Sequence, residues 1–258
     1  MRHRSSRRAL LVAVAAVLSG LLAITPVEAQ SGRGFLFGEP GLLLGIRGGY
    51  GIATAGSDIF DFSREQLTLS KSDFNSLTGQ AEVGFRLHSR VYLMGTVGYS
   101  GTVADSESRL FEGSDDLPIL QTTEFRRVPV TAGLRFYPLE TGRRVGSFVW
   151  VPATFTPYVG AAVGGMWHRF VQEGEFVDDS EPLDDGSFPI FRDRFESSGW
   201  TTALEGFAGV EYTLAPRWVM TAEGRYTRAD AELSSRFQDF EPIDLSGFSL
   251  TVGISFRN

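Results

Sequence analysis

Eight stretches of this chain alternate apolar and polar residues over about ten positions, the length at which a tilted β-strand crosses an outer membrane. In the last stretch, Leu250, Val252 and Ile254 share one face, whereas Thr251 and Gly253 share the other. After residue 30 no apolar run reaches the roughly 20 residues that a membrane-spanning helix needs. A closed barrel is then the structure that pairs every backbone group inside a bilayer. We therefore predict an all-β fold, an eight-stranded antiparallel up-and-down transmembrane β-barrel.

The charged residues of these stretches lie on the face that lacks the aliphatic side chains. A soluble lipocalin-like barrel would show the opposite arrangement, with apolar residues inside and charges outside. The fifth stretch is rich in glycine and alanine, so its two faces are the least clear. The predicted strands cover residues 42–52, 77–88, 91–103, 128–136, 157–170, 200–214, 218–227 and 248–256.

The connections between these strands alternate in length. Those after the second and sixth strands are short, and those after the first, third, fifth and seventh are long. In outer-membrane barrels the short turns lie in the periplasm and the long loops outside the cell, which places both mature termini in the periplasm. The connection 138–156 is long for a periplasmic turn. Its apolar run 148–151 fits either a strand or a segment on the inner leaflet.

Aromatic residues gather at both ends of the predicted strands, as amphipathic rings do at lipid–water boundaries. We expect one belt at the periplasmic ends and a second at the outer ends. The periplasmic belt holds Phe85, Phe136, Tyr158, Tyr212, Trp218 and Phe256, and the outer belt holds Tyr50, Tyr99, Trp167, Trp200, Tyr226 and Phe248.

The N-terminus has the features of a secretion signal. Four arginines occur in the first eight positions, an apolar run covers 10–24, and Val27-Glu28-Ala29 precedes the expected cleavage point. A transmembrane helix is the alternative, but the run is shorter than about 20 residues. The chain contains no cysteine, which excludes a disulfide and a lipid anchor on cysteine. We predict a signal peptide (1–29), a periplasmic N-terminal segment (30–40) and an outer-membrane β-barrel (41–258), located in the cell outer membrane.

The charge balance is acidic. The net charge is −7, and it becomes −10 without the first 29 residues, which hold four arginines and one glutamate. Binding nucleic acid needs a basic face, so we expect no nucleic-acid partner. The small size of the barrel favours a monomer.

Two segments carry a resemblance to a known family: Arg127–Pro138, with the sequence RVPVTAGLRFYP, and Pro157–Gly165, with the sequence PYVGAAVGG. With the last strand, they resemble the small outer-membrane β-barrel proteins of the opacity-protein and outer-membrane-protein-A type. The resemblance implies the barrel fold and insertion by the barrel assembly machinery, and it implies no activity. In that family the chain typically ends on an aromatic residue, whereas here Arg257 and Asn258 follow Phe256.

Charged side chains predicted to face the lumen balance one another. Eight strands enclose an interior that side chains can fill, and buried charges need partners. We expect a mid-barrel ion-pair network that closes the lumen, with a gated or narrow pore as the alternative. A porin-sized channel is excluded by the number of strands. The candidate residues are Arg47, Glu82, Arg86, Arg135, Glu205, Glu211, Glu223 and Arg225.

Acyl chemistry on a lipid would need a histidine beside a serine nucleophile near the outer rim. His88 falls in a periplasmic turn, and His168, near the outer end of the fifth strand, has no serine at positions 166 or 170. Ser100 and Ser198 are the nearest candidates from other strands. We interpret His168 as a rim residue and assign no catalytic, cofactor-binding or metal-binding residue.

The expected outer loops are acidic. Clustered carboxylates suit hard cations, so divalent ions could bind there or bridge the loops to outer-membrane lipid. The spacing in 178–186 does not match the calcium-loop pattern, which favours a solvated loop. The third outer loop holds Glu173, Glu175, Asp178, Asp179, Glu181, Asp184, Asp185, Asp193 and Glu196.

These patterns favour a non-enzymatic outer-membrane β-barrel protein that stabilises the envelope or binds surfaces through its acidic outer loops. The alternatives are a narrow pore for small solutes and, less favoured, a lipid-modifying outer-membrane enzyme.

Overall fold

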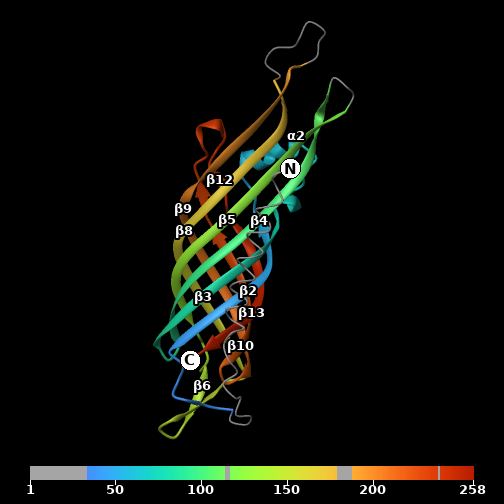
Figure 1. Ribbon diagram of the computed structural model, residues 1–258. Coiled ribbons are helices and arrows are strands. Elements are labelled where there is room, and N and C mark those ends of the chain that lie inside the picture. Colours follow the sequence, from blue (N-terminus) through green and yellow to red (C-terminus); the bar gives the residue numbers. More distant parts are fainter. Residues whose placement is uncertain (1–33, 114–116, 179–187, 238) are drawn as a thin grey trace. The chain divides into compact units, whose positions relative to one another are not determined.

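Eight long strands close into one barrel in the computed structural model, which describes residues 34–113, 117–178, 188–237 and 239–258 (Figure 1). The chain divides into two units, Met1–Gly34 and Phe35–Asn258, and the second contains every element described below. The predicted signal peptide lies outside the described residues.

Each barrel strand pairs antiparallel with the next one along the chain, and the last pairs with the first. The predicted transmembrane barrel is therefore confirmed. The strands are β2 (Leu42–Ala53), β3 (Ser76–His88), β4 (Val91–Glu112), β5 (Pro118–Phe136), β8 (Phe155–Val177), β9 (Ile190–Ala215), β10 (Trp218–Arg228) and β13 (Gly247–Arg257).

The two ends of the barrel differ. At the turn end, β3 joins β4 and β9 joins β10 through two residues each. At the loop end lie the connections from β2 to β3, β4 to β5, β8 to β9 and β10 to β13. The loop end carries the helix α2 (Asp58–Gln66), the 3₁₀ helices Lys71–Phe74 and Ser235–Phe237, and the strands β11 (Asp230–Ala231) and β12 (Ile243–Asp244). Neither α2 nor any other helix in the described ranges is long and apolar enough to cross a membrane.

Four strands, β4, β5, β8 and β9, extend far beyond their predicted bounds at the loop end. Pairing of β3 with β4 ends at Thr78 and Ser100, and pairing of β9 with β10 ends at Leu204 and Arg228. Beyond these points β4, β5, β8 and β9 continue together (Figure 1). Charged residues such as Asp105, Glu173 and Arg194 interrupt the apolar residues on their outward face, so the apolar alternation that predicts a membrane strand no longer holds. We call this part, residues 101–112, 118–127, 168–177 and 190–203, the outer sheet.

Loops cover much of both free edges of the outer sheet, which limits pairing with other chains. On the β4 side, the backbone N–H of Thr68 donates to the carbonyl of Glu107 over 2.9 Å. On the β9 side, Arg236 Nη1 donates to the carbonyl of Arg194 over 2.9 Å.

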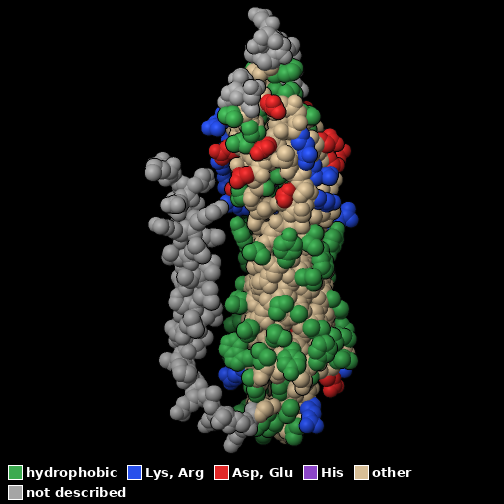
Figure 2. Space-filling view, turned by 90° about the vertical axis from the view of Figure 1, so that its right-hand side faces the viewer, with side chains coloured by type: hydrophobic (Ala, Val, Ile, Leu, Met, Phe, Trp, Pro, Cys, Tyr) green, Lys and Arg blue, Asp and Glu red, His purple; other side chains and the backbone are tan. Residues whose placement is uncertain are grey.

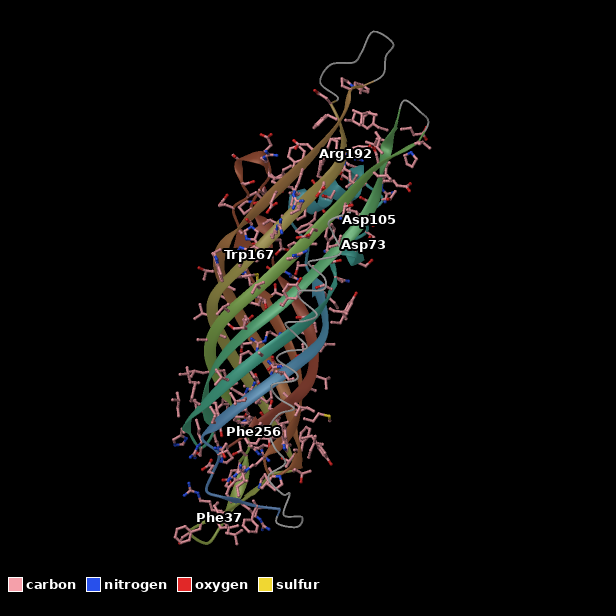
Figure 3. All side chains as sticks on the ribbon, in the orientation of Figure 1. Phe37, Asp73, Asp105, Trp167, Arg192 and Phe256 are labelled. Atoms are coloured by element: carbon pink, nitrogen blue, oxygen red, sulfur yellow. The ribbon has the colours of Figure 1, made fainter. Side chains whose placement is uncertain are left out.

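An apolar band surrounds the barrel below the outer sheet. Outward side chains such as Leu77 and Leu204 are 79% and 56% exposed, as expected for a lipid-facing surface. Figure 2 shows hydrophobic side chains over the lower part of the molecule and charged ones over the upper part. Trp167 and Phe256, from the two predicted aromatic belts, lie at different heights on the barrel (Figure 3).

One predicted belt residue does not face lipid. Tyr158 is buried in the lumen, because β8 turns Val159 and Val163 outward. The prediction that Tyr158 belongs to the periplasmic belt was wrong, since glycine and alanine hid the faces of this strand.

The long connection 138–156 and the segment before β2 together form a small three-stranded sheet at the turn end. Its strands are β1 (Leu36–Phe37), β7 (Val149–Pro152) and β6 (Gly142–Val145), in the order β1-β7-β6. Trp150 is buried, and the guanidinium of Arg257 lies 5.2 Å from its ring. The apolar run therefore continues as a strand, and Trp150 packs against the last residues of the barrel.

Neighbouring strands approach closely beside Gly253. A Cβ added there would lie 1.9 Å from the carbonyl oxygen of Ile46, whereas one added at Gly206 would meet no heavy atom within 4 Å. Overpacking costs about 1–3 kcal/mol, so we expect Gly253→Ala to lower the free energy of unfolding of the barrel by this amount. Urea unfolding in lipid vesicles measures it. Gly206→Ala is the matched control, with a change within about 0.5 kcal/mol. Equal effects of both substitutions would contradict this register.

Candidate functional site

Four buried charged side chains meet in the middle of the lumen. Arg47 Nη1 lies 2.8 Å from Glu82 Oε2 and 3.1 Å from Glu223 Oε2. Arg135 Nη2 lies 2.7 Å from the same oxygen of Glu82 and 3.6 Å from that of Glu223. Because each carboxylate faces two guanidinium groups, the charges compensate one another where water does not reach them.

The network continues toward both ends of the barrel. Toward the loop end, Arg225 forms ion pairs with Glu205 and with Glu223, the latter over 2.9 Å. Toward the turn end, Arg135 Nη1 lies 3.2 Å from Glu211 Oε1. The structure thus brings together seven of the eight side chains predicted for the lumen: Arg47, Glu82, Arg135, Glu205, Glu211, Glu223 and Arg225.

Arg86 does not join this network. Its Nη1 lies 2.6 Å from Glu39 Oε2, in the segment that precedes β2. The parity of β3 turns Arg86 to the same side as Glu82, but its position near the turn end brings it to the N-terminal segment. Placing it in the mid-barrel network was wrong, because the sequence pattern gave no position for Glu39.

Aromatic rings close the lumen between the network and the turn end. Tyr158 Oη donates to Glu223 over 2.8 Å, and Tyr137 Oη donates to Glu211 over 2.8 Å. The guanidinium of Arg135 lies 4.1 Å from the Tyr158 ring centroid, a cation–π contact. This layer packs together Leu43, Tyr92, Met94, Tyr137, Tyr158 and Phe207.

An apolar plug fills the loop end of the lumen. The helix α2, with Asp58 in its first turn and Arg64 in its last, matches the helix dipole and buries Ile59, Phe60 and Ser63. The plug combines residues of the first loop, the last loop and the strands: Ala53, Ala55, Ile59, Phe60, Leu67, Leu69, Phe74, Phe125, Met166, Phe170, Ala203, Ala229, Ala231, Phe237, Ile243 and Leu245.

Phe60 is the centre of this plug. Its ring centroid lies 4.7 Å from that of Phe74, 5.3 Å from that of Phe125 and 5.9 Å from that of Phe170, all edge-on. On the same helix, Ser63 Oγ accepts a hydrogen bond from Gln172 Nε2 over 2.9 Å. From the sequence this segment was expected only as a long outer loop. Ile59, Phe60 and Ser63, buried at helical spacing, hold the signal that could have revealed the helix.

Arg127 is a lumen arginine that the sequence analysis missed. It is buried, and its Nη1 donates to the carbonyls of Leu245 and Ser246 over 2.9 and 3.2 Å. These bonds join the wall of the barrel to the last loop. On β5, Arg127 shares the inward face with Thr131 and Arg135. A predicted strand that began earlier would therefore have placed it inside the barrel.

His168 is buried beside the plug and is not a rim residue. Neither ring nitrogen has a hydrogen-bond partner among the described residues. Ser198 is the register partner of Arg169 and is exposed. Ser100 makes no hydrogen bond with the imidazole within the described residues. The geometry therefore provides no activated serine at this histidine.

The outward face of the outer sheet carries a chain of ion pairs. Arg169 Nε lies 2.8 Å from Glu196 Oε1, and Arg194 Nη1 lies 2.7 Å from Glu173 Oε2. The hydrogen bond from Arg169 holds the pKa of Glu196 below its ordinary value. Arg192, nearer the tips of these hairpins, pairs with Glu175 over 3.3 Å (Figure 3). Exposed pairs of this kind are worth about 0–1 kcal/mol each, so they order the surface more than they stabilise it.

No group of three or more histidine, aspartate or glutamate side chains is placed to hold a metal ion within the described ranges. Of the predicted acidic loop, Asp179, Glu181, Asp184 and Asp185 lie outside them. Divalent-ion binding at this loop stays a prediction.

No protein-family model and no curated protein matches this chain. Solved structures similar to it are outer-membrane proteins. They include OprG from Pseudomonas aeruginosa, at 14% identity over 88% of this chain and 99% of that one, with a TM-score of 0.42. Ail of Yersinia pestis, solved with the heparin analogue sucrose octasulfate, shows 15% identity over 84% and 99%, with a TM-score of 0.40.

The outer-membrane protease OmpT from Escherichia coli is also similar, at 9% identity over 88% of this chain and 99% of that one, with a TM-score of 0.39. The barrel assignment rests on the strand pairing described above. Barrels of this kind serve different functions, so the function must be argued from the side chains of this chain.

Proposed function

We propose that this protein is a closed, non-enzymatic barrel of the outer membrane that binds surfaces or partners through its outer sheet and loops. The observation that carries the proposal is the filling of the lumen at three levels. The apolar plug, the ion-pair network and the aromatic layer leave the protruding outer sheet as the part offered to the surroundings.

The exposed side chains of the outer sheet support this role. Leu110, Leu120 and Phe191 are exposed there although they lie outside the lipid-facing band. Apolar side chains beyond the membrane and beside paired charges are typical of a protein-binding surface. The small sheet β1-β7-β6 lies at the turn end of the barrel, opposite the outer sheet (Figure 1).

Shortening the outer sheet tests the proposal. We expect a variant in which tight turns replace residues 105–122 and 173–194 to fold, and to shift on a gel between unheated and boiled samples as the wild type does. Cells that display this variant should lose adhesion to protein-coated surfaces relative to cells that display the wild-type barrel. Arg86→Ala, which removes an ion pair at the turn end, is the control and should retain adhesion. Equal adhesion of wild type and shortened variant would overturn the proposed role of the outer sheet.

A narrow pore is the second candidate, favoured by a small cavity of about 50 Å³ within the lumen. It predicts conductance that Glu82→Ala or Arg47→Ala changes, because both side chains are buried in the lumen.

A further inference from the structure

The cavity lies between the apolar plug and the ion-pair network, and residues of all eight barrel strands line it. Its volume of about 50 Å³ exceeds the roughly 10–15 Å³ that one water molecule needs, so it has room for a small ion with water. Its polar lining includes Gln80, Ser100, Arg127, Glu205, Arg225 and Thr227.

Arg127 brings an uncompensated charge to this cavity. It is 7% exposed and makes no ion pair within the described residues. Its Nη1 donates to the carbonyls of Leu245 and Ser246, whereas no hydrogen bond involves its Nε or Nη2 in that part of the chain. A buried cation needs a counter-charge, and the remaining N–H groups of Arg127 are free to contact one in the cavity.

The carboxylates nearby are already engaged. Glu205 forms an ion pair with Arg225 and accepts hydrogen bonds from Thr131 over 2.8 Å and from Thr227 over 3.4 Å. Asp244, in the last loop, accepts hydrogen bonds from the backbone N–H groups of Gly56 and Ser246 over 3.0 and 2.8 Å. Neither comes within ion-pair distance of Arg127.

The other buried arginines of the lumen differ from Arg127. Arg47, Arg135 and Arg225 each pair with two or more carboxylates. Arg257 lies at the turn end, donates to Pro216 O over 2.8 Å and to Thr213 Oγ1 over 3.0 Å, and does not line the cavity. The uncompensated positive charge therefore lies at the cavity.

A further donor lies in the same layer of the barrel. Ser100 brings a hydroxyl group to the cavity, whereas the hydroxyl of Thr227 already donates to Glu205. His168, the register partner of Arg127, is 1% exposed and does not line the cavity. The unpaired N–H groups of Arg127 and the hydroxyl of Ser100 favour an anion over a cation in this small space.

We propose that this cavity is a binding site for a small monovalent anion, chloride, held by Arg127 and by the hydroxyl group of Ser100. Since Arg127 also binds the carbonyls of the last loop, the bound anion stabilises the contact between that loop and the barrel wall. The site concerns the filling of the lumen and does not depend on the proposed adhesive role.

Unfolding in matched salts tests this site. The full barrel is refolded in sodium chloride or, at equal ionic strength, in sodium gluconate, whose anion is too large for the cavity. We expect chloride to raise the ratio of folded to unfolded protein in a saturable way, by about 100-fold at 100 times its Kd. Gluconate gives no such rise. Arg127→Gln should abolish the difference between the salts, whereas Arg86→Gln, at the turn end, should retain it.

Crystals grown in sodium bromide provide a readout that needs no variant. We expect an anomalous peak in the cavity beside the Arg127 guanidinium. Equal unfolding in chloride and gluconate, or a chloride effect that persists in Arg127→Gln, would overturn the proposal. A bromide crystal without an anomalous peak in the cavity would also overturn the proposal.

Discussion

Arg135→Met is expected to destabilise the barrel by about 3–5 kcal/mol, because breaking a buried ion pair leaves uncompensated charge. The Arg135 side chain is fully buried and lies within ion-pair distance of Glu82, Glu211 and Glu223. Methionine fills part of the space but supplies no donor, so these carboxylates lose a common partner. Urea unfolding in lipid vesicles, followed by circular dichroism, measures the free energy of unfolding.

A matched variant separates burial from charge. Arg86→Met removes an arginine of the same barrel whose side chain is 26% exposed and pairs with Glu39. A partly exposed pair contributes about 0–1 kcal/mol, so this variant should unfold close to the wild type. If Arg135→Met also stayed within about 1 kcal/mol, the network would not hold the lumen together as described.

Phe60→Ala should remove about 3–5 kcal/mol from the stability of the plug, the range for deleting a buried phenylalanine ring. The residue is fully buried and touches three other rings at the centre of the plug. The first loop contacts the barrel through this core, so local opening should precede global unfolding. Hydrogen exchange of the α2 amides measures the loss as faster exchange.

Phe62 on the same helix is the control. It is 46% exposed and makes one edge-on contact, with Phe240. We expect Phe62→Ala to cost about 1 kcal/mol, in line with the worth of an aromatic pair. Similar exchange rates in both variants would mean that α2 does not seal the barrel through Phe60.

The barrel could be predicted from the sequence because lipid imposes a regular pattern on every strand it contacts. Outward residues such as Leu204 and Val252 alternate with inward ones, and this parity also places Arg47 and Glu82 in the lumen. Where lipid contact ends, the constraint ends too. The outer sheet was therefore missed, and with it the inward position of Arg127.

The interior contacts were harder to predict, because they depend on segments that lie far apart in the sequence. The partner of Arg86 is Glu39, outside any predicted strand. The plug brings Phe60 of the first loop to Phe125 and Phe170 of two strands. Alternation assigns a face to each strand residue, but it gives no position to a loop that folds back into the barrel.

Planar-bilayer recording of the purified barrel tests the central claim, a lumen closed at three levels, most directly. The structure predicts no conductance steps above the empty-membrane baseline, either for the wild type or for Phe60→Ala, because the network and the aromatic layer remain when the plug loosens. Discrete steps in the wild type, changed by Glu82→Ala or Arg47→Ala, would contradict the closed lumen and make a narrow pore the function of this protein.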